Sequence, residues 1–383
     1  MENISLNFVH SISDIGKKAW NAVAGIDNPF TRYEFLWALE ESGCTTAETG
    51  WAPHHVVVYK QTDGEEKVIA VMPLYLKTNS WGEYVFDWSW ANAYKSYGFE
   101  YYPKFVSAVP FTPSYGNRVF IESGEQTKAI IKLIRDKVIE KGEFIGASSW
   151  HILFPTESEH QQFGELGILP RIASQFHWFN KDYKSFDDFL QALSSRKRKN
   201  IRKERQQVKN QGVTFETVNG ADINELQWEK FNQFYQSTYM MRGMQGYLNV
   251  EFFQMLSETM PEQLFMVIAR QDKIMIAASL FFRSSEKVMG RYWGSARDYQ
   301  FLHFETCYYQ GQDYCIEHGL KSFDAGAQGE HKIQRGFEPI ITYSNHWLAN
   351  QGFSEAIDNF LSEERTHIEE YIEQARAQLP LKK

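Results

Sequence analysis

Two similar pairs of apolar, β-branched runs constrain the fold of this sequence more than any other feature. The runs are residues 54–60 and 68–77, then residues 264–270 and 274–283. Asp63-Gly64 between the first two is a turn signal, and only Gln-Asp-Lys separates the second two, so each pair predicts an antiparallel hairpin. In both pairs the second run passes from a core sequence into a basic residue, Lys77 or Arg283. We predict one α/β unit present twice, with chance similarity between β-rich segments as the alternative.

Amphipathic helical patterns accompany both hairpins. Apolar residues recur with a helical period in residues 28–43, 125–141 and 304–318. Gly142 and Gly319 follow the last two segments and are typical of helix ends. The third helix leads directly into a short strand and a glycine-bearing loop. This order of strand, helix, strand and loop is typical of an α/β fold.

The length of 383 residues predicts two domains, because a chain of this size usually exceeds one hydrophobic core. One large domain with insertions is the alternative. The boundary is expected between residues 170 and 185, before the first helix of the second half. We therefore predict an N-terminal domain at residues 1–175 and a C-terminal domain at residues 176–383.

Bulk properties limit the classes of partner and location. The net charge of −8 argues against a protein that coats nucleic acid, so no DNA partner is expected. The first residues lack the basic and apolar stretches of a signal peptide, and no window of about 18 to 20 apolar residues predicts a membrane span. A cytoplasmic location is therefore expected. Cys44, Cys307 and Cys315 form no CxxC pair, so reduced, buried thiols are expected. The oligomeric state is left open.

A basic segment at residues 196–209 is the clearest local feature. Its cations are Arg196, Lys197, Arg198, Lys199, Arg202, Lys203, Arg205 and Lys209. On a helix, Arg198, Arg202 and Arg205 share one face. One interpretation is a solvated helix face. The other is a site for a phosphorylated ligand or an RNA backbone, because so many neighbouring cations repel one another unless an anion lies nearby.

A second group of chemically active side chains follows a predicted strand end, within residues 323–347. The group comprises Glu330, His331, Lys332 and Arg335, among the glycines Gly326, Gly329 and Gly336. Glycines allow close backbone approach, and loops in this position commonly hold ligands in α/β folds. Gln328 of this loop is a candidate for binding a carbonyl or an oxyanion. An ordinary polar surface loop is the alternative.

His303 and Glu305, at the start of the third predicted helix, are candidates for a general base. Burial beside aromatic side chains would move the pKa of either group toward neutrality. A structural role is the alternative for each. The sequence contains no HxxxH or HExxH motif and no histidine-carboxylate pair at a metal-ligand spacing, so no metal site is expected. A GxSxG elbow, a Walker lysine loop and a GxGxxG loop after a strand are also missing.

Aromatic residues are frequent, with 11 Trp, 20 Tyr and 29 Phe, and many fall between Trp81 and Tyr115. Packing in large cores accounts for most aromatic residues in globular proteins. A ligand-lining role for part of this stretch is the second interpretation.

Several segments resemble the FemAB-type family. LSSRKRKNIRKERQQVKNQGVTFETV is similar to the family's basic helix that leads through Gly-Val into a strand. GLKSFDAGAQGEHKIQRGFEP is similar to its later strand, Asp-x-Gly turn and Lys/Arg-Gly-Phe run. In the first half, TGWAPHHV, PLYLK, GEYVFDWSWANAY, YYPKF and AVPFTP resemble a bacterial branch described as FemAB-like and associated with peptidoglycan biosynthesis or recognition.

This resemblance implies an α/β fold with two GNAT-like units, each a mixed, mostly antiparallel sheet flanked by helices. It implies transfer of an activated acyl group to an amine or hydroxyl of a small-molecule or peptide acceptor, such as a cell-wall precursor. The donor is left open between acyl-coenzyme A and aminoacyl-tRNA, which are both polyanionic, and no tightly bound cofactor is expected. The alternatives are a binding protein that recognises peptidoglycan fragments or RNA, and an enzyme of another class.

The same resemblance implies roles for individual residues, with Lys332 and Arg335 facing donor phosphates or the developing oxyanion. The expected catalytic set is Lys332 together with His303, Glu305 and Gln328, which are candidates by their own side-chain chemistry. Donor phosphates are expected to contact Arg196, Arg198, Arg202, Arg205 and Arg335. The acceptor is expected to contact Trp81, Asp87, Tyr101, Lys104, Tyr292 and Trp293.

Overall fold

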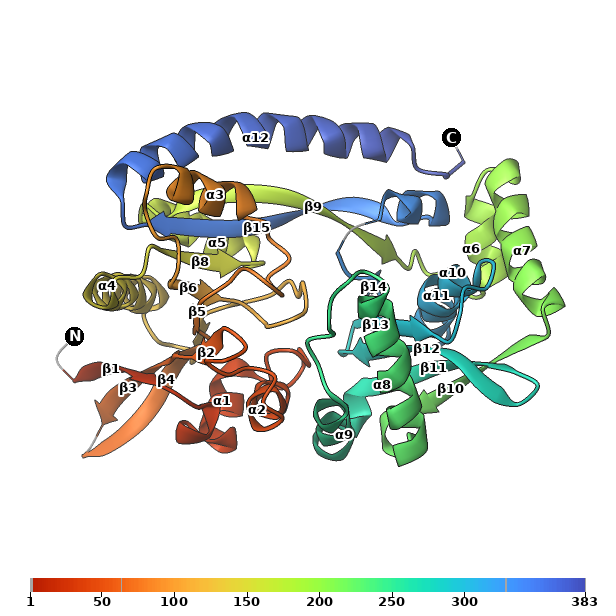
Figure 1. Cartoon of the computed structure of the whole chain (residues 1–383), viewed down its shortest axis with the longest axis horizontal. Coiled ribbons are helices and arrows are strands. Elements are labelled where there is room, and N and C mark those ends of the chain that lie inside the picture. The colour runs from red at the N-terminus through yellow and green to blue at the C-terminus, as the bar shows by residue number, and fades with distance from the viewer. Residues whose placement is uncertain (1–2, 63, 328, 383) are drawn as a thin grey trace. The chain divides into compact units, whose positions relative to one another are not determined.

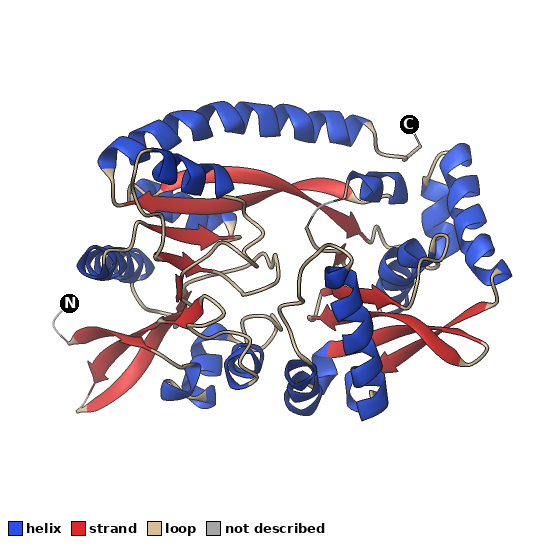
Figure 2. Cartoon of the chain, in the orientation of Figure 1, coloured by secondary structure: helices blue, strands red, loops and turns tan. Residues whose placement is uncertain are grey.

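The computed structural model describes residues 3–62, 64–327 and 329–382, and the chain divides into two compact units (Figure 1). Unit 1 consists of Met1–Ala173 and Ile341–Glu370, and unit 2 consists of Ser174–Ile340 and Tyr371–Lys383. Both units combine helices with mostly antiparallel strands, as Figure 2 shows. The expected mixed α/β class is therefore confirmed.

The predicted ranges, 1–175 and 176–383, differ from these units near the C-terminus. Residues 341–370 belong to unit 1 because the end of strand β15 (Glu338–Leu348) pairs antiparallel with β8 (Ser149–Leu153). This return of the chain depends on a pairing between distant segments. A sequence pattern with a local period carries no information about it.

Unit 1 contains two groups of strands. The four-stranded antiparallel sheet has the order β1 (Ile4–Val9), β3 (His55–Thr62), β4 (Glu65–Met72) and β7 (Phe120–Ile121). The second group has the order β15, β8, β6 (Lys104–Ser107), β5 (Tyr75–Lys77) and β2 (Trp51–Pro53). The helices of this unit are α1 (Lys17–Ala24), α2 (Tyr33–Glu41), α3 (Trp88–Ser96), α4 (Thr127–Ile145), α5 (Glu157–Glu165) and the first part of α12 (Gln351–Ala377).

Helix α4 supplies one face of the unit 1 core. Its buried apolar residues are Ile130, Ile131, Ile134 and Val138, in one cluster with residues of β3, β4 and β8. The helix continues through Gly142, which was the wrong choice for its end, and stops at Gly146, whose φ is 73°. A Cβ at Gly142 would lie 3.3 Å from the Trp347 ring. Close packing, rather than helix termination, therefore accounts for this glycine.

Unit 2 is built on a sheet with one parallel strand pair. The strand order is β10 (Val213–Asn219), β11 (Leu264–Gln271), β12 (Ile274–Arg283), β13 (Lys287–Ser295), β14 (Ser322–Asp324) and the end of β9 (Leu169–Phe179). Only β13 and β14 are parallel among these described neighbours. The helices are α6 (Phe186–Ala192), α7 (Ser195–Asn210), α8 (Glu225–Met240), α9 (Val250–Thr259), α10 (Leu302–Phe304) and α11 (Gln310–Glu317).

Both predicted hairpins are present, one in each unit. Strands β3 and β4 pair antiparallel in unit 1, and β11 and β12 do so in unit 2. The predicted helix at residues 304–318 begins earlier, at Leu302, and a π-helical turn at Glu305–Tyr309 separates α10 from α11. Such turns within helices are frequent at functional sites. That the two units are copies of one ancestral unit stays a prediction.

Gly294 of β13 allows helix α8 to pack directly on the strand. A Cβ at Gly294 would lie 2.2 Å from the carbonyl carbon of Phe234 in α8. Gly294→Ala is therefore expected to lower the free energy of unfolding by about 1–3 kcal/mol, the usual range for overpacking. Chemical denaturation measures this loss.

The matched control is Gly164→Ala in α5, where no described atom lies within 4 Å of an added Cβ. Alanine favours the helix more than glycine does, so this variant should be neutral or slightly stabilised. A Gly294→Ala variant as stable as the original chain would contradict the close approach of α8.

Candidate active site

Strands β13 and β14 separate after a short parallel contact. Their register joins Lys287–Met289 to Ser322–Asp324, whereas β13 continues to Ser295 beside β12. Beyond Met289 the described register gives β13 no β14 partner on this edge. An opening therefore forms between the two strands at the C-terminal end of β14, a position where open α/β sheets commonly bind ligands.

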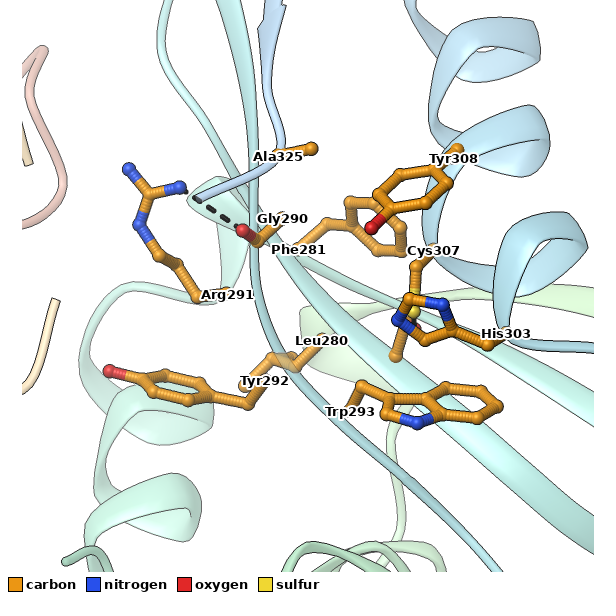
Figure 3. A pocket seen from close by; sticks show the side chains of 11 residues that line it. Leu280, Phe281, Gly290, Arg291, Tyr292, Trp293, His303, Cys307, Tyr308 and Ala325 are labelled. Carbon is orange, nitrogen blue, oxygen red and sulfur yellow. Dashed lines mark hydrogen bonds between the residues drawn. The ribbon is translucent and has the colours of Figure 1, made fainter. Parts of the chain in front are cut away.

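A β-bulge at Arg291 lies where the strands separate. The register pairs Phe281 with Gly290 and Leu280 with Tyr292. Arg291 is thus the extra residue, and a bulge of this kind bends a strand and redirects its side chains. Figure 3 shows the outcome: Arg291 and Tyr292 extend to one side of β13, and Trp293 extends to the other.

A cavity of about 90 Å³ lies at the opening (Figure 3). It is lined by Ser279, Leu280, Phe281, Gly290, Arg291, Tyr292, Trp293, His303, Cys307, Tyr308 and Ala325. The His303 ring contacts the rings of Trp293 and Tyr308 edge to face, each with ring centroids 5.3 Å apart. Ser279 Oγ and Cys307 Sγ are 2.9 Å apart. The cavity is therefore mainly aromatic, with a few polar groups.

Burial determines the protonation of two groups in the cavity. It lowers the pKa of His303 to about 4, and nearby His331 and Lys332 add to this effect. It raises the pKa of the Cys307 thiol to about 12, against a smaller opposing effect of Ser279. At neutral pH the His303 ring is therefore neutral and Cys307 carries its proton. The expected shift of the His303 pKa toward neutrality is wrong, because burial disfavours the charged imidazolium and moves this pKa downward.

An ion pair holds β13 to the end of β14. Arg291 Nη2 lies 2.5 Å from Asp324 Oδ2, and Nη1 donates to the carbonyl oxygen of Gly290 at 3.0 Å. The Gly326 N–H donates to Asp324 Oδ1 at 2.8 Å. Burial alone would raise the pKa of Asp324, but Arg291 and His177 hold it well below its usual range. Asp324 is therefore a carboxylate whose two oxygens are already bound.

Lys332 is buried beneath the loop that follows β14. Its Nζ lies 2.7 to 3.4 Å from the carbonyl oxygens of the three residues Ala325–Ala327. These contacts match the three N–H donors of an ammonium group. Burial lowers the pKa of Lys332 to about 8, while Asp324 opposes the shift and Arg291 adds to it. Lys332 therefore binds the backbone of its own loop, next to the cavity.

Arg335 of the same loop region is also buried. Its Nη2 lies 2.9 Å from Glu204 Oε2, and its guanidinium carbon lies 3.4 Å from the centroid of the Phe304 ring. The Tyr309 hydroxyl donates to the same Glu204 oxygen. Gln328, which belongs to the predicted catalytic set, lies outside the described residues.

Glu305 is buried in the π-helical turn and pairs with a cation from α7. Arg205 Nη2 lies 2.9 Å from Glu305 Oε1 and 2.7 Å from Asp313 Oδ2. Gln310 Nε2 also donates to Glu305 Oε1, at 2.7 Å. The sequence predicted a catalytic role for Glu305 and a phosphate-binding role for Arg205. The structure instead joins these two residues in one ion pair.

The other predicted cations of α7 lie apart from this ion pair. Arg196 is exposed, and Arg202 forms an exposed ion pair of 2.8 Å with Asp187. Arg198 is half-buried and donates to Gln191 and Ser195. The predicted basic face of the helix is therefore divided. Arg205 forms ion pairs with Glu305 and Asp313, and the other three arginines lie toward the surface of unit 2.

Three predicted acceptor-binding residues form a buried polar network in unit 1. Lys104 Nζ contacts Asp87 Oδ2, Glu83 Oε2 at 2.8 Å and Ser80 Oγ at 2.9 Å. The Tyr101 hydroxyl donates to Asp87 Oδ2 at 2.6 Å. All of these side chains are buried. Lys104 thus binds two acidic side chains inside the unit, and Lys77 Nζ lies 3.9 Å from the other oxygen of Glu83.

The network continues through two histidines. Tyr101 Oη lies 3.0 Å from His151 Nε2, His151 Nδ1 lies 2.7 Å from His346 Nδ1, and His346 Nε2 lies 2.9 Å from Ser344 Oγ. Burial holds the pKa of both histidines well below the ordinary value, so both rings are neutral. One Nδ1 must then donate to the other. Burial also raises the pKa of Glu83 to about 7.

The remaining acceptor candidates lie elsewhere. Trp81 is 47% exposed in unit 1, and its ring centroid lies 4.9 Å from that of Trp88. Tyr292 and Trp293 line the cavity of unit 2. The predicted acceptor set is therefore distributed over both units, and its action as one site stays a prediction.

Residues 11–383 match the model of a family described as FemAB-like, peptidoglycan biosynthesis/recognition. The chain belongs to the FemAB-like family. Its fold resembles the C-terminal DUF2156 domain of a protein named as a lysylphosphatidylglycerol synthetase from Agrobacterium fabrum, with 9% identity, 92% of this chain and 97% of that chain covered, and a TM-score of 0.53. FemX is similar at 12% identity, with 92% and 100% covered and a TM-score of 0.52. At these identities the likeness concerns the fold alone.

No curated protein matches the sequence of this FemAB-like chain. Within residues 3–62, 64–327 and 329–382, none of its helices is both long enough and apolar enough to cross a bilayer.

Sequence reasoning assigned no functional role to Cys307 and Tyr308, which line the cavity of this FemAB-like chain. It also assigned none to Asp324, which binds Arg291. One signal was present, because Cys307 follows His303 by one helical turn and therefore shares its face. Asp324 ends a predicted strand two residues before Gly326, a position typical of a turn that binds its own backbone.

Proposed function

We propose that this FemAB-like chain is an acyltransferase that binds the acyl end of an activated donor in the opening between β13 and β14. The donor is an acyl-coenzyme A or an aminoacyl-tRNA, and the acceptor is an amine or hydroxyl of a cell-wall precursor. The family description supports the choice of acceptor. The observation that carries the proposal is the small aromatic cavity where the parallel strand pair separates.

The opening suits acyl transfer because it places the backbone of the β13 edge, with its N–H groups, beside a cavity. Beyond Met289 the described register pairs β13 with β12 and no longer with β14. In the proposal such an N–H group donates to the acyl carbonyl oxygen, which gains negative charge in the transition state. Preorganised donors of this kind contribute much of the rate of acyl transfer.

The acceptor attacks the donor directly in this proposal. Its nitrogen or oxygen forms a bond to the acyl carbon while the thioester or ester bond breaks. His303, whose neutral ring lies in the cavity wall, accepts the proton that the attacking group loses; with a pKa of about 4 it is a weak base and holds this proton only transiently. That proton then passes to the leaving thiolate or alkoxide. Cys307 forms no acyl intermediate, because a thiol with a pKa of about 12 is a poor nucleophile at neutral pH.

The charged residues around the cavity are proposed to hold its walls in place. Lys332 and the Arg291–Asp324 pair hold the loop after β14, and Glu305 with Arg205 holds the π-helical turn that carries Cys307. Arg196, Arg198 and Arg202 on α7 are proposed to meet donor phosphates, since they lie toward the surface of unit 2.

Direct assay of transfer tests the function. The purified chain is mixed with isotope-labelled acetyl-coenzyme A or alanyl-tRNA and with amine acceptors that include lysine-containing muropeptides and amino sugars. Mass spectrometry of the acceptors should detect one added acyl group. Retention of muropeptides without any transfer from either donor would instead favour the binding-protein alternative.

Two substitutions of Cys307 locate the reaction in the cavity. Cys307→Leu places a larger side chain there and should lower transfer by at least about 10-fold, since it occupies space that the acyl group needs. Cys307→Ser preserves the space and should retain most of the activity, because no thiolate is required. Activity and thermal melts are measured on both variants. Loss of activity in Cys307→Ser with an unchanged melting temperature would contradict direct attack.

A further inference from the structure

We infer that the unit 2 cavity selects a short acyl group that carries no positive charge, and that Trp293 limits the length of that group. The inference rests on the proposed acyl transfer and specifies the chemistry of its donor. Neither the family description nor the similar folds state the size or charge of the group transferred.

The size of the cavity limits the acyl chain. Binding sites for whole ligands usually measure about 300–1,000 Å³, so a space of about 90 Å³ holds only the end of a donor. An engineered apolar cavity of about 150 Å³ is filled by benzene, which has six carbon atoms. The space at the opening therefore suits about two to four non-hydrogen atoms, as in an acetyl or propionyl group.

The walls of the cavity are held in place by their own contacts. The Trp293 ring lies against His303, and the His303 ring lies against Tyr308. The Tyr308 hydroxyl in turn lies 2.8 Å from His331 Nε2. In Figure 3 the side chains of Trp293, His303, Cys307 and Tyr308 gather on one side of β13. A longer acyl chain would have to displace one of these rings.

The charge of the lining disfavours an α-ammonium group. Among the described residues that line the cavity, none is Asp or Glu. The carbonyl oxygens nearby already accept hydrogen bonds from the protein's own cations: Gly290 from Arg291, and Ala325 and Gly326 from Lys332. A buried ammonium without a carboxylate partner is strongly unfavourable.

The carboxylates of Asp324 and Glu305 do not change this balance. Asp324 is bound to Arg291, and Glu305 is bound to Arg205. Either acid would have to leave its arginine partner to bind an incoming ammonium. Breaking a buried ion pair in this way usually costs several kcal/mol. An uncharged acyl group meets no such obstacle.

Propionyl and glycyl donors provide the sharpest test of charge. The two acyl groups have nearly the same shape, and one carries a methyl where the other carries an ammonium. Each is supplied on coenzyme A and, separately, on tRNA, with the acceptor that shows transfer in the assay above. On either carrier, kcat/KM for propionyl should exceed that for glycyl by at least about 100-fold, reflecting the unpaired buried charge. Glycyl transfer equal to or faster than propionyl transfer overturns the inference.

A chain-length series tests the role of Trp293. The original chain should transfer octanoyl at least about 100-fold less efficiently than acetyl, because extra methylenes do not fit. Trp293→Ala, with Trp293→Leu as a milder variant, should raise the octanoyl-to-acetyl ratio at least about 10-fold. Trp228→Leu is the matched control: Trp228 is buried in the same unit and does not line the cavity, so this ratio should not change.

The outcomes separate the two proposals. Equal use of acetyl and octanoyl by the original chain overturns the length limit while transfer itself still stands. A ratio that rises equally in Trp228→Leu shows general loosening of unit 2 and overturns the role of Trp293. If no acyl group is transferred from any carrier, the proposed function fails, and this inference fails with it.

Discussion

Lys104→Met is expected to lower the free energy of unfolding by about 3–5 kcal/mol, the range for removing one partner of a buried ion pair. The Lys104 side chain is fully buried and contacts the carboxylates of Glu83 and Asp87. Methionine fills a similar volume but leaves Asp87 without its lysine and Glu83 with only the more distant Lys77, whose Nζ lies 3.9 Å from Glu83 Oε1. Denaturant unfolding at neutral pH measures the loss.

The pH dependence of this variant provides a second measurement. Burial already raises the pKa of Glu83 to about 7, against an ordinary value of 4.5, despite the presence of Lys104. An acid whose pKa is raised by folding binds more protons in the folded state, so its contribution to stability falls as pH rises from about 4.5 to 7. Without Lys104 this window should extend to higher pH. The destabilisation should therefore be larger at pH 8 than at pH 5.

Two further substitutions test the cause. Adding Glu83→Gln and Asp87→Asn to Lys104→Met removes both acids and should restore most of the lost stability, because Lys77, whose pKa burial lowers to about 7, can lose its proton once Glu83 is replaced. Lys67→Met is the exposed control, because the Lys67–Glu122 pair lies at the surface and such pairs contribute about 0–1 kcal/mol. A Lys104→Met variant no less stable than Lys67→Met would mean that the unit 1 network is hydrated.

Lys332→Met is expected to lower kcat/KM for acyl transfer by at least about 100-fold, the effect of misplacing reacting groups by about an ångström. The ammonium of Lys332 holds three consecutive carbonyl oxygens of the loop after β14, and Ala325 of this loop lines the cavity. Loss of these three contacts should move the loop and also lower the melting temperature of the protein. Both quantities are measured for each variant, so that activity is expressed per folded molecule.

The pH profile separates positioning of the loop from a general loss of stability. Burial lowers the pKa of Lys332 to about 8, so the ammonium loses its proton as pH rises through that value. Transfer by the original chain should therefore decline above about pH 8, and this decline should be missing in Lys332→Met. Lys321→Met is the control, since Lys321 is 72% exposed and pairs with Glu286 at the surface. Normal activity per folded molecule in Lys332→Met would remove this loop from the active site.

The candidate site could be predicted only in part from the sequence. The sequence pointed to His303 as a titratable residue at the start of a predicted helix, and the family resemblance pointed to Tyr292 and Trp293. All three line the cavity. The cavity itself depends on the bulge at Arg291 and on the separation of β13 from β14. Neither feature has a local signal, since each arises from register between strands.

The basic helix shows the same division. The spacing of its cations predicted a helix with one basic face, and α7 is that helix. Spacing could not show that Arg205 turns inward to bind Glu305 and Asp313 while Arg202 stays exposed. Those partners lie about a hundred residues further along the chain, and only folding brings them within reach.

The sequence by itself determined the two hairpins, the apolar face of α4, the α/β class and the family of this chain. These properties follow from turn residues, from the periods of helices and strands, and from motifs that are continuous in the chain. Only the tertiary structure decided that residues 341–370 return to unit 1, that Lys332 binds its own loop, and that a cavity opens beside Trp293. Each of these depends on packing and pairing between residues that are distant in sequence.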